Sequence, residues 1–194
     1  MSALCQIMEE FMRRIAKFYK VSREQFFEGW MDTFPGTERA DMEKIYENIS
    51  LPKRATAGSA GYDFFSPVDF QLGPGETIKI PTGIRAQMEP DWVLKIYPRS
   101  GLGFKYRLQL NNTVGIIDSD YFNSDNEGHI FIKITNDSKE GKTVQVQGGT
   151  GFAQGIFLEY GLRWMMTLLQ SATEEWEAPQ ENRNKNLAYY FGLC

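Results

Sequence analysis

The segment 98–103 (PRSGLG) combines side chains and backbone groups that can bind a highly charged ligand. Arg99 supplies a fork of cationic N–H donors, Ser100 a hydroxyl group, and Gly101 a backbone N–H that no side chain shields. These are the donors that an oligophosphate requires. The segment is not a Walker loop, because the chain lacks the spacing G-x-x-x-x-G-K-[ST]. The sequence therefore predicts a phosphate-binding turn of another kind, although the same residues can form an ordinary turn.

The segment 112–121 (NTVGIIDSDY) ends an apolar run in two acids and an aromatic residue. Asp118 directly follows an apolar pair, so we expect its carboxylate at the end of a strand rather than free in a loop. A polar stretch, 122–128, and another apolar run come next. A hairpin of this kind can present backbone groups to a base and an aromatic face to a sugar. Segments rich in Asp and Asn are also common as plain turns.

Two further segments carry weaker signals. Residues 57–64 (AGSAGYDF) place the carboxylate of Asp63 after small residues that allow close backbone approach. Residues 148–157 (GGTGFAQGIF) place Gln154 inside a strand that reads as buried, where an amide must find hydrogen-bond partners. Glycine-rich turns often precede strands, so the first of these segments alone indicates little.

The elements that would position these residues are β-strands. From residue 51 onward, alternating apolar runs separated by Gly, Pro and Asn turns recur at about 8–12 residues, which is typical of an antiparallel sandwich, jelly roll or barrel. No βαβ rhythm is present, which argues against a parallel-sheet nucleotide fold. The predicted strands are 76–81, 84–88, 93–97, 108–110, 130–134, 143–146 and 152–157.

Residues 1–50 are predicted to form a helical extension that packs on the β domain or on a partner. An apolar stripe at four-three spacing predicts a first helix. Ser22, with Gln25 three residues later, indicates a capping-box start for a second helix, and a third follows the break at residues 34–36. The apolar residues that predict the first and third helices are Leu4, Met8, Phe11, Ile15, Phe18, Met42, Ile45, Tyr46 and Ile49.

Composition limits the function classes. A net charge of −4 argues against a nucleic-acid partner, which would require a basic face. No apolar run approaches the ~20 residues that span a membrane. The two cysteines, Cys5 and Cys194, lie at opposite ends of the chain, which favours a reducing cytoplasm over a disulfide framework or a zinc site. The single histidine, His129, begins an apolar run and is interpreted as structural.

Taken in order, the motifs A-G-Y-D, P-R-S-G-L-G, N-x-x-G-I-I-D-S-D-Y and F-A-Q-G-I-F resemble the trimeric dUTPase family over roughly residues 51–160. The resemblance implies a mainly β fold, a distorted jelly roll or antiparallel β-barrel, preceded by the helical extension. It implies hydrolysis of dUTP to dUMP and pyrophosphate. It also implies a homotrimer in which each site is assembled from several subunits.

The resemblance also implies roles for individual residues. Asp118 would activate the water that attacks the α-phosphorus. Tyr121 would stack on the deoxyribose and leave no room for a 2′-hydroxyl. Mg²⁺ would bind mainly to the triphosphate, with Asp63 reaching it through water. Uracil would be read by Asn112 and by backbone groups at Gly115, Ile116 and Ile117, and the phosphates would be held by Arg99, Ser100, Gly101 and Gln154.

The chain departs from the family pattern in two places. Thr150 and Gly151 stand where the family usually carries an acid and often an arginine. The tail, 161–194, lacks the family's glycine-rich arm, and we hypothesise that it is read in a shifted frame. In the alternative frame the codons of residues 164–167 must spell Asp-Asp-Asp, and those of residues 171–179 can spell Arg-Asn-Gly-Gly-Met-Gly-Ser-Thr. Such a chain would bind dUTP weakly and turn it over slowly.

Two other functions compete with this interpretation. A dCTP deaminase shares the fold, but in that family a catalytic Glu occupies the position of Lys133, which cannot replace a carboxylate base. A non-catalytic dUTP-binding or regulatory relative would explain the missing arm but not the intact Asp118 and Tyr121.

Overall fold

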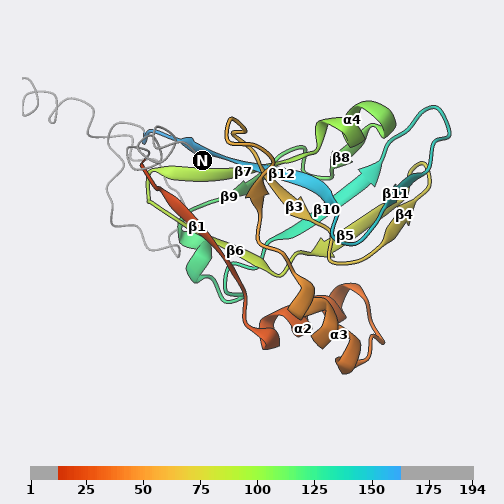
Figure 1. The fold of residues 1–194 in the computed structure, drawn as a ribbon, viewed down its shortest axis with the longest axis horizontal. Coiled ribbons are helices and arrows are strands. Elements are labelled where there is room, and N and C mark those ends of the chain that lie inside the picture. Colours follow the sequence, from red (N-terminus) through yellow and green to blue (C-terminus); the bar gives the residue numbers. More distant parts are fainter. Residues whose placement is uncertain (1–12, 163–194) are drawn as a thin grey trace, which may run out of the picture. The chain divides into compact units, whose positions relative to one another are not determined.

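The computed structural model of the chain describes residues 13–162. Up to Gly161 the described residues belong to one compact unit. Antiparallel strands dominate this unit (Figure 1), as the sequence predicts. The tail that was interpreted as frameshifted lies almost wholly outside the described residues, so that hypothesis stays a prediction.

The largest sheet runs through the centre of the domain. Its order is β2-β3-β12-β7-β9, and every neighbouring pair is antiparallel. The long strand β12 lies between β3 and β7, and its sequence places small residues where neighbouring side chains crowd in: a Cβ on Gly155 would lie 2.8 Å from a Leu94 methyl carbon. The strands are β2 (Lys53–Arg54), β3 (Tyr62–Phe65), β12 (Gly151–Glu159), β7 (Trp92–Pro98) and β9 (Gly115–Ile117).

Three smaller sheets complete the domain. They pair β1 with β6, β10 with both β5 and β8, and β11 with β4. Alternate residues of β10 are buried, including Ile132 and Ile134, so one face of this strand packs into the core. The strands are β1 (Ala16–Lys20), β4 (Phe70–Leu72), β5 (Thr77–Pro81), β6 (Ile84–Met88), β8 (Leu108–Leu110), β10 (Phe131–Asn136) and β11 (Val144–Val146).

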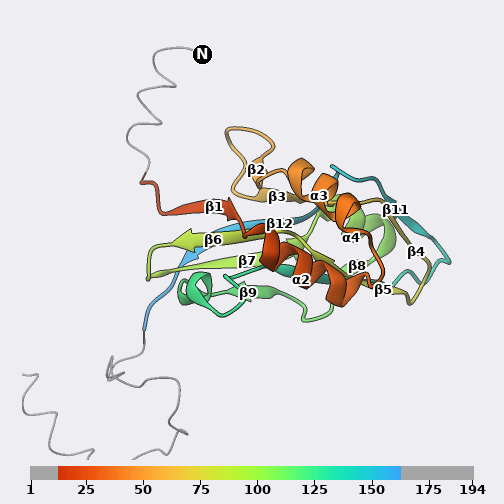
Figure 2. The same cartoon turned by 90° about the horizontal axis from the view of Figure 1, so that it is seen from below.

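The first part of the N-terminal extension is not helical where the structure describes it. Residues 16–20 form β1, which pairs with β6 along its whole length (Figure 2). The predicted stripe from Leu4 to Phe18 is therefore wrong at its C-terminal end, and residues 1–12 lie outside the described part. Phe18 is buried and packs edge-on against Tyr62 and Phe64. Pairing with the edge of β6 and the aromatic packing of Phe18 favour a strand here, in spite of the helical spacing of the apolar residues.

The two later helices of the extension form as predicted. They are α2 (Arg23–Thr33) and α3 (Arg39–Asn48), and the Ser22 hydroxyl caps α2 by accepting from Gln25 N at 3.1 Å. The reciprocal half of the capping box is absent, because Ser22 N donates to Glu127 instead, at 2.8 Å. Phe26 and Trp30 are buried and form the inner face of α2. No helix within residues 13–162 is long and apolar enough to cross a membrane.

Candidate functional site

A pocket of about 280 Å³ lies beside β9 and β10. It gathers the predicted base-reading residues on one side and residues of β10 on the other. Gly115 allows close packing here, because a Cβ would lie only 3.0 Å from the Cβ of Ile96 on the neighbouring strand β7. The lining residues are Ile96, Leu110, Asn111, Asn112, Gly115, Ile116, Ile117, Ile130, Phe131, Ile132 and Lys133.

A tight turn brings Asn112 to this pocket. Thr113 adopts a left-handed conformation, with φ of 66°, and its N–H donates to the carbonyl of Leu110 at 3.0 Å. The N–H of Val114 donates to the carbonyl of Asn112 at 2.7 Å. These bonds reverse the chain between β8 and β9, so the backbone at Asn112 is held at the pocket edge.

Asp118 and Tyr121 follow β9 directly. Asp118 is exposed, and its carboxylate makes no ion pair or hydrogen bond with the described residues. Tyr121 belongs to the 3₁₀ turn η1 (Asp120–Asn123), and its N–H donates to the carbonyl of Asp118 at 3.3 Å. The Tyr121 hydroxyl donates to the carbonyl of His129 at 2.9 Å and accepts from Asn126 Nδ2 at 2.9 Å. The phenol is therefore fixed at its tip, whereas the carboxylate is free to meet water. Together with the pocket, these residues form what we call the nucleoside half of the site.

His129 lies in the core behind Tyr121. Its side chain is fully buried, and its Nε2 accepts from the N–H of Gly83 at 2.9 Å. Burial lowers the pKa of His129 to about 4, against a smaller opposing effect of the Glu127 charge. The ring is therefore neutral at neutral pH and serves as part of the core.

Arg99 lies at the end of β7, as the N-cap of α4 (Ser100–Tyr106). Its Nε lies 3.3 Å from Asp63 Oδ1, and its Nη1 donates to the carbonyl of Gly151 at 3.5 Å. Gln154 pairs with Asp63 on one side and with Tyr97 on the other, and its Nε2 donates to the carbonyl of Pro98 at 3.2 Å. The residues Asp63, Arg99, Ser100, Gly101 and Gln154 are called the phosphate half of the site.

The register of β7 separates the two halves within one protomer. Ile117 pairs with Leu94 and Gly115 pairs with Ile96, so the chain toward Asp118 runs away from Arg99. Arg99 lies five residues beyond Leu94, which corresponds to about 16 Å along a strand. One bound nucleotide cannot meet Asp118 and Arg99 of the same protomer at its α-phosphate.

A protein-built metal cage is absent from the described residues. Residues 13–162 contain no group of three or more His, Cys, Asp or Glu side chains that could hold an ion. Asp63 is the carboxylate beside Arg99 and is only 15% exposed. This arrangement fits a Mg²⁺ ion carried by phosphate oxygens and reached by Asp63 through water, because Mg²⁺ retains much of its hydration shell.

Sequence reasoning missed the contribution of β10 to the pocket. Phe131 and Lys133 of β10 line it, and Lys133 enters the sequence-based prediction only as the position of a deaminase's acid. The run 129–135 (HIFIKIT) predicts a strand but not which side of it faces a cavity. That depends on the pairing of β10 with β8, which is a contact between distant segments.

Known proteins match this chain over most of its length. The dUTPase family model matches residues 47–185. A deoxyuridine 5'-triphosphate nucleotidohydrolase of Lactococcus lactis is 42% identical over 118 residues, covering 59% of this chain and 77% of the relative. The corresponding protein of Dictyoglomus turgidum is 37% identical over 126 residues, covering 63% and 81%.

Solved structures agree with these relatives. The crystal structure of dUTPase from Streptococcus mutans is 34% identical, with a TM-score of 0.55, and the match covers 75% of this chain and 97% of that one. The dUTPase from phage phi11 of S. aureus, 20% identical with a TM-score of 0.55, shows the same fold. With the family model spanning more than half of the sequence, this chain belongs to the dUTPase family.

Proposed function

We propose that this chain hydrolyses dUTP to dUMP and pyrophosphate, with the nucleoside half binding uracil and deoxyribose and the phosphate half binding the triphosphate. The observation that supports this most directly is the segment 112–121, which contains β9. This segment contributes Asn112 and the β9 residues to the pocket lining, and it also carries the exposed Asp118 carboxylate and the hydrogen-bonded Tyr121 phenol. The curated relatives are named for this reaction.

The pocket is suited to binding a flat, polar base. Backbone groups at Gly115, Ile116 and Ile117 border it, together with Asn112. Backbone N–H and carbonyl groups are fixed donors and acceptors, so they distinguish the edge of one base from another without side-chain rearrangement. The Tyr121 ring, held at its hydroxyl, supplies a rigid surface for the sugar. A 2′-hydroxyl has no space where the ring contacts the sugar closely, so deoxyribose is preferred.

Asp118 acts as the general base. Its exposed carboxylate accepts a proton from a water molecule, and the resulting nucleophile attacks the α-phosphorus. No cation of the described residues pairs with this carboxylate, so it is open to a water molecule. Pyrophosphate leaves with the charge that develops on its oxygens.

The phosphate half stabilises that charge. Arg99 presents a guanidinium group, Ser100 a hydroxyl, and Gly101 a backbone N–H at the first turn of α4, while Gln154 supplies an amide. When bound, Mg²⁺ would neutralise charge on the triphosphate oxygens, which is a dominant contribution in phosphoryl transfer. Asp63 is the residue that would reach the ion through water. A structure of the related fold in phage phi11 describes coordination of a structural Mg(II) ion.

The separation of the two halves supports a homotrimer with shared sites. Asp118 of one protomer and Arg99 of another would meet at one triphosphate, because the same pair within a protomer lies apart along β7. Cyclic symmetry repeats such a composite site at every interface. The cysteine content supports a cytoplasmic location for this activity.

The replacement Asp118→Asn tests the proposed reaction. It keeps the shape of the side chain but removes the base, so we expect pyrophosphate release from dUTP to fall by about 10²–10⁴-fold. Affinity for dUMP should remain within about twofold, because no bond of the pocket is lost. The matched control is Asp120→Asn, an exposed acid two residues away, which should keep the activity. Equal losses in the two variants would reject Asp118 as the base.

A second measurement separates the rival reaction. The chain should release no ammonia from dCTP, because the described pocket contains Lys133 where a deaminase requires a carboxylate. Ammonia release that depends on the pocket would reject the proposed function.

A further inference from the structure

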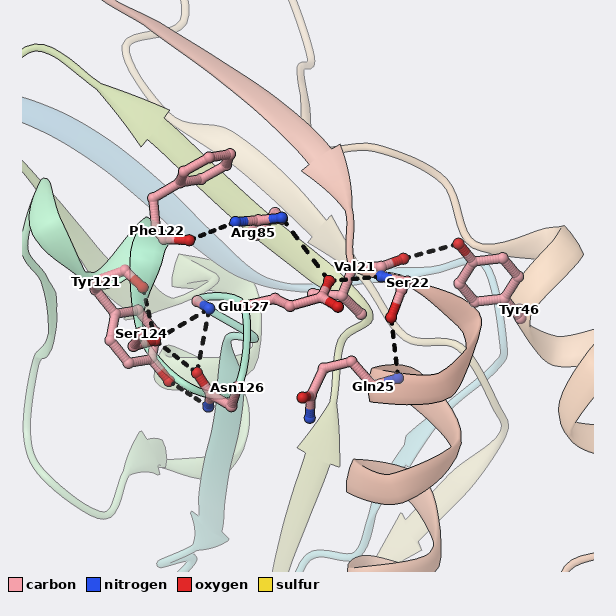
Figure 3. Close-up of polar contacts among 11 residues, drawn as sticks. Val21, Ser22, Gln25, Tyr46, Arg85, Tyr121, Phe122, Ser124, Asn126 and Glu127 are labelled. Carbon is pink, nitrogen blue, oxygen red and sulfur yellow. Dashed lines mark hydrogen bonds and ion pairs between the residues drawn. The ribbon is translucent and has the colours of Figure 1, made fainter.

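We propose that the N-terminal extension, residues 13–50, positions Tyr121 through Glu127 and thereby sets the preference of the nucleoside half for deoxyribose. This inference rests on the proposed function, which assigns the sugar to Tyr121. Figure 3 shows the contacts that connect the extension to the loop after Tyr121. In this arrangement Glu127 is a positioning residue and does not touch the substrate.

The loop 122–128 closes tightly on Tyr121. Ser124 Oγ donates to the carbonyl of Tyr121 at 2.7 Å, and Asn126 Nδ2 donates to the Tyr121 hydroxyl at 2.9 Å. The N–H of Gly128 donates to Asn126 Oδ1 at 3.1 Å. Both ends of Tyr121, its carbonyl and its hydroxyl, are therefore bonded to this one loop.

Backbone conformation makes the loop stiff where it turns back. Glu127 has φ of 57° and Gly128 has φ of 71°, so two successive residues lie in the left-handed region. A Cβ on Gly128 would lie 2.7 Å from the carbonyl oxygen of Tyr121. The left-handed conformation is unfavourable for a residue with a Cβ such as Glu127, so contacts of its side chain are needed to hold it there.

Those contacts come from the extension and from β6. Ser22 N, at the start of α2, donates to Glu127 Oε2 at 2.8 Å. Arg85 Nη1 on β6 lies 3.8 Å from the same oxygen, and its guanidinium group also donates to the carbonyl of Phe122 and lies 3.6 Å from the centre of that ring. The Ser22 N–H lowers the pKa of the Glu127 carboxyl below its usual range, so the acceptor stays ionised at neutral pH.

A second contact of the extension supports the other partner of the phenol. The Tyr121 hydroxyl donates to the carbonyl of His129, and the His129 ring packs on α2 at Gly29. A Cβ at Gly29 would lie 3.0 Å from His129 Nδ1 and 2.8 Å from the tip of the Phe131 ring. Helix α2 thus acts at both partners of the hydroxyl, Asn126 by way of the loop and His129 by direct packing.

This arrangement has a specific consequence for sugar selection. The Tyr121 ring can exclude a 2′-hydroxyl sterically only if the ring itself is held in place. If the loop relaxes, the ring can move away from the sugar. The affinity for a ribonucleotide then rises more than the affinity for a deoxyribonucleotide does. Loss of the Ser22–Glu127 bond should therefore lower the preference for dUMP over UMP clearly. The stability of the fold should change less.

The pair Ser22→Pro and Ser22→Ala tests this. Ser22 has φ of −61°, which proline adopts without strain. Both replacements remove the hydroxyl that caps α2, but only proline also removes the N–H that Glu127 accepts. The measurement is the dissociation constant of dUMP and of UMP by calorimetry, which requires no turnover, with thermal unfolding recorded for each variant.

We expect the preference for dUMP over UMP to fall about fivefold to tenfold in Ser22→Pro and to stay within about twofold of the original in Ser22→Ala. Equal preferences in the two variants would overturn the inference, because loss of the helix cap, which both variants share, would then explain the whole change. An unchanged preference in Ser22→Pro would overturn it as well.

The acceptor gives an independent test. Glu127→Gln keeps an oxygen that can accept from Ser22 N, whereas Glu127→Ala removes it and leaves the same backbone strain. The preference for dUMP should survive largely in the glutamine variant and fall about fivefold to tenfold in the alanine variant. Equal losses would reject the contact as the cause.

Failure of the proposed function would look different. A chain that binds dUMP and UMP equally before any replacement, or whose Tyr121→Ala variant keeps the original preference, would remove Tyr121 from sugar selection altogether. The Ser22 and Glu127 variants bear on the extension only when the original chain shows the preference.

Discussion

The nucleoside half and the phosphate half of the site are built in different ways. In the nucleoside half, the Tyr121 hydroxyl has two hydrogen-bond partners, and a buried ring and a helix of the extension lie behind them. In the phosphate half, Arg99 is 42% exposed and contacts Asp63 and the carbonyl of Gly151 at the long end of the bonding range. One half is fixed within a single protomer, whereas the other has spare donors.

The difference agrees with what the proposed function assigns to each half. A base and a sugar are neutral and rigid, so selectivity comes from shape that exists before binding. A triphosphate is flexible, strongly charged and accompanied by hydrated Mg²⁺, so its partners must reorganise around it. Donors that are already satisfied could not do so. The exposed Arg99 is suited to that role.

The sharpest test of the comparison is a subunit mixture, in which the largest change is expected. Arg99→Ala and Asp118→Asn chains should each be nearly inactive alone, by about 10²–10³-fold for the arginine. If sites combine Asp118 of one protomer with Arg99 of another, random mixed trimers restore about a quarter of the sites. Pyrophosphate release from dUTP after mixing, unfolding and refolding together would measure this recovery.

The control for the mixture is the same pair of chains refolded separately and then combined without exchange. These should stay inactive. If the mixture that was refolded together also stays inactive while forming trimers, the two halves act within one chain, and the separation along β7 must be bridged in some other way.

Much of this comparison could be predicted from local sequence. The motifs predict roles for Asp118, Tyr121, Arg99 and Gln154, and the structure brings Asp63, Arg99 and Gln154 together. Alternating apolar runs predicted most of the strands, because burial of one face has a period of two. The strands β2, β3 and β4 were not among them, although the equally short β8 and β11 were.

Contacts between distant segments were the part that local patterns could not predict. The spacing of Ile15 and Phe18 suggested a helix, yet β6 offers a strand edge that Ala16–Lys20 occupies. The pair Ser22 and Gln25 suggested a complete capping box, yet the Ser22 N–H finds Glu127, which is 105 residues away in the sequence. In each case the partner comes from another part of the fold, and no local pattern encodes it.

Acid should weaken the nucleoside half through His129. Burial lowers its pKa to about 4, whereas an unfolded histidine has a pKa of about 6.5. Below about pH 6.5 the unfolded chain binds a proton that the folded chain does not, so folding stability is full above that pH and falls as the pH approaches about 4. We expect a loss of roughly 2 kcal/mol between about pH 8 and pH 5, measured by urea unfolding.

The chain has one histidine, which makes this prediction easy to isolate. Glu127 and Arg85 face the same region, but Glu127 has its pKa lowered and stays ionised through most of this window. A His129→Gln variant, with an amide oxygen in place of Nε2 as acceptor for Gly83 N, should show a smaller pH dependence. In the original chain, proton NMR should show no histidine titration between about pH 7 and pH 5. A midpoint near 6.5 would contradict the buried, neutral state.

The smallest effect is expected at Gly151, where the chain departs from the family pattern. A Cβ at this position would lie 3.0 Å from Arg99 Nη1, 3.2 Å from Arg99 Cδ and 3.4 Å from Asp63 Cβ. Gly151→Ala should therefore move the guanidinium group by a few tenths of an ångström without disturbing the strand. Because Arg99 is exposed and adaptable, we expect kcat/KM for dUTP to fall only about threefold, with dUMP affinity unchanged. Thr150→Ala, at the exposed neighbouring residue, is the control and should show no loss. A drop of about a hundredfold in Gly151→Ala would mean that the phosphate half is as rigid as the nucleoside half, and the contrast between them would not hold.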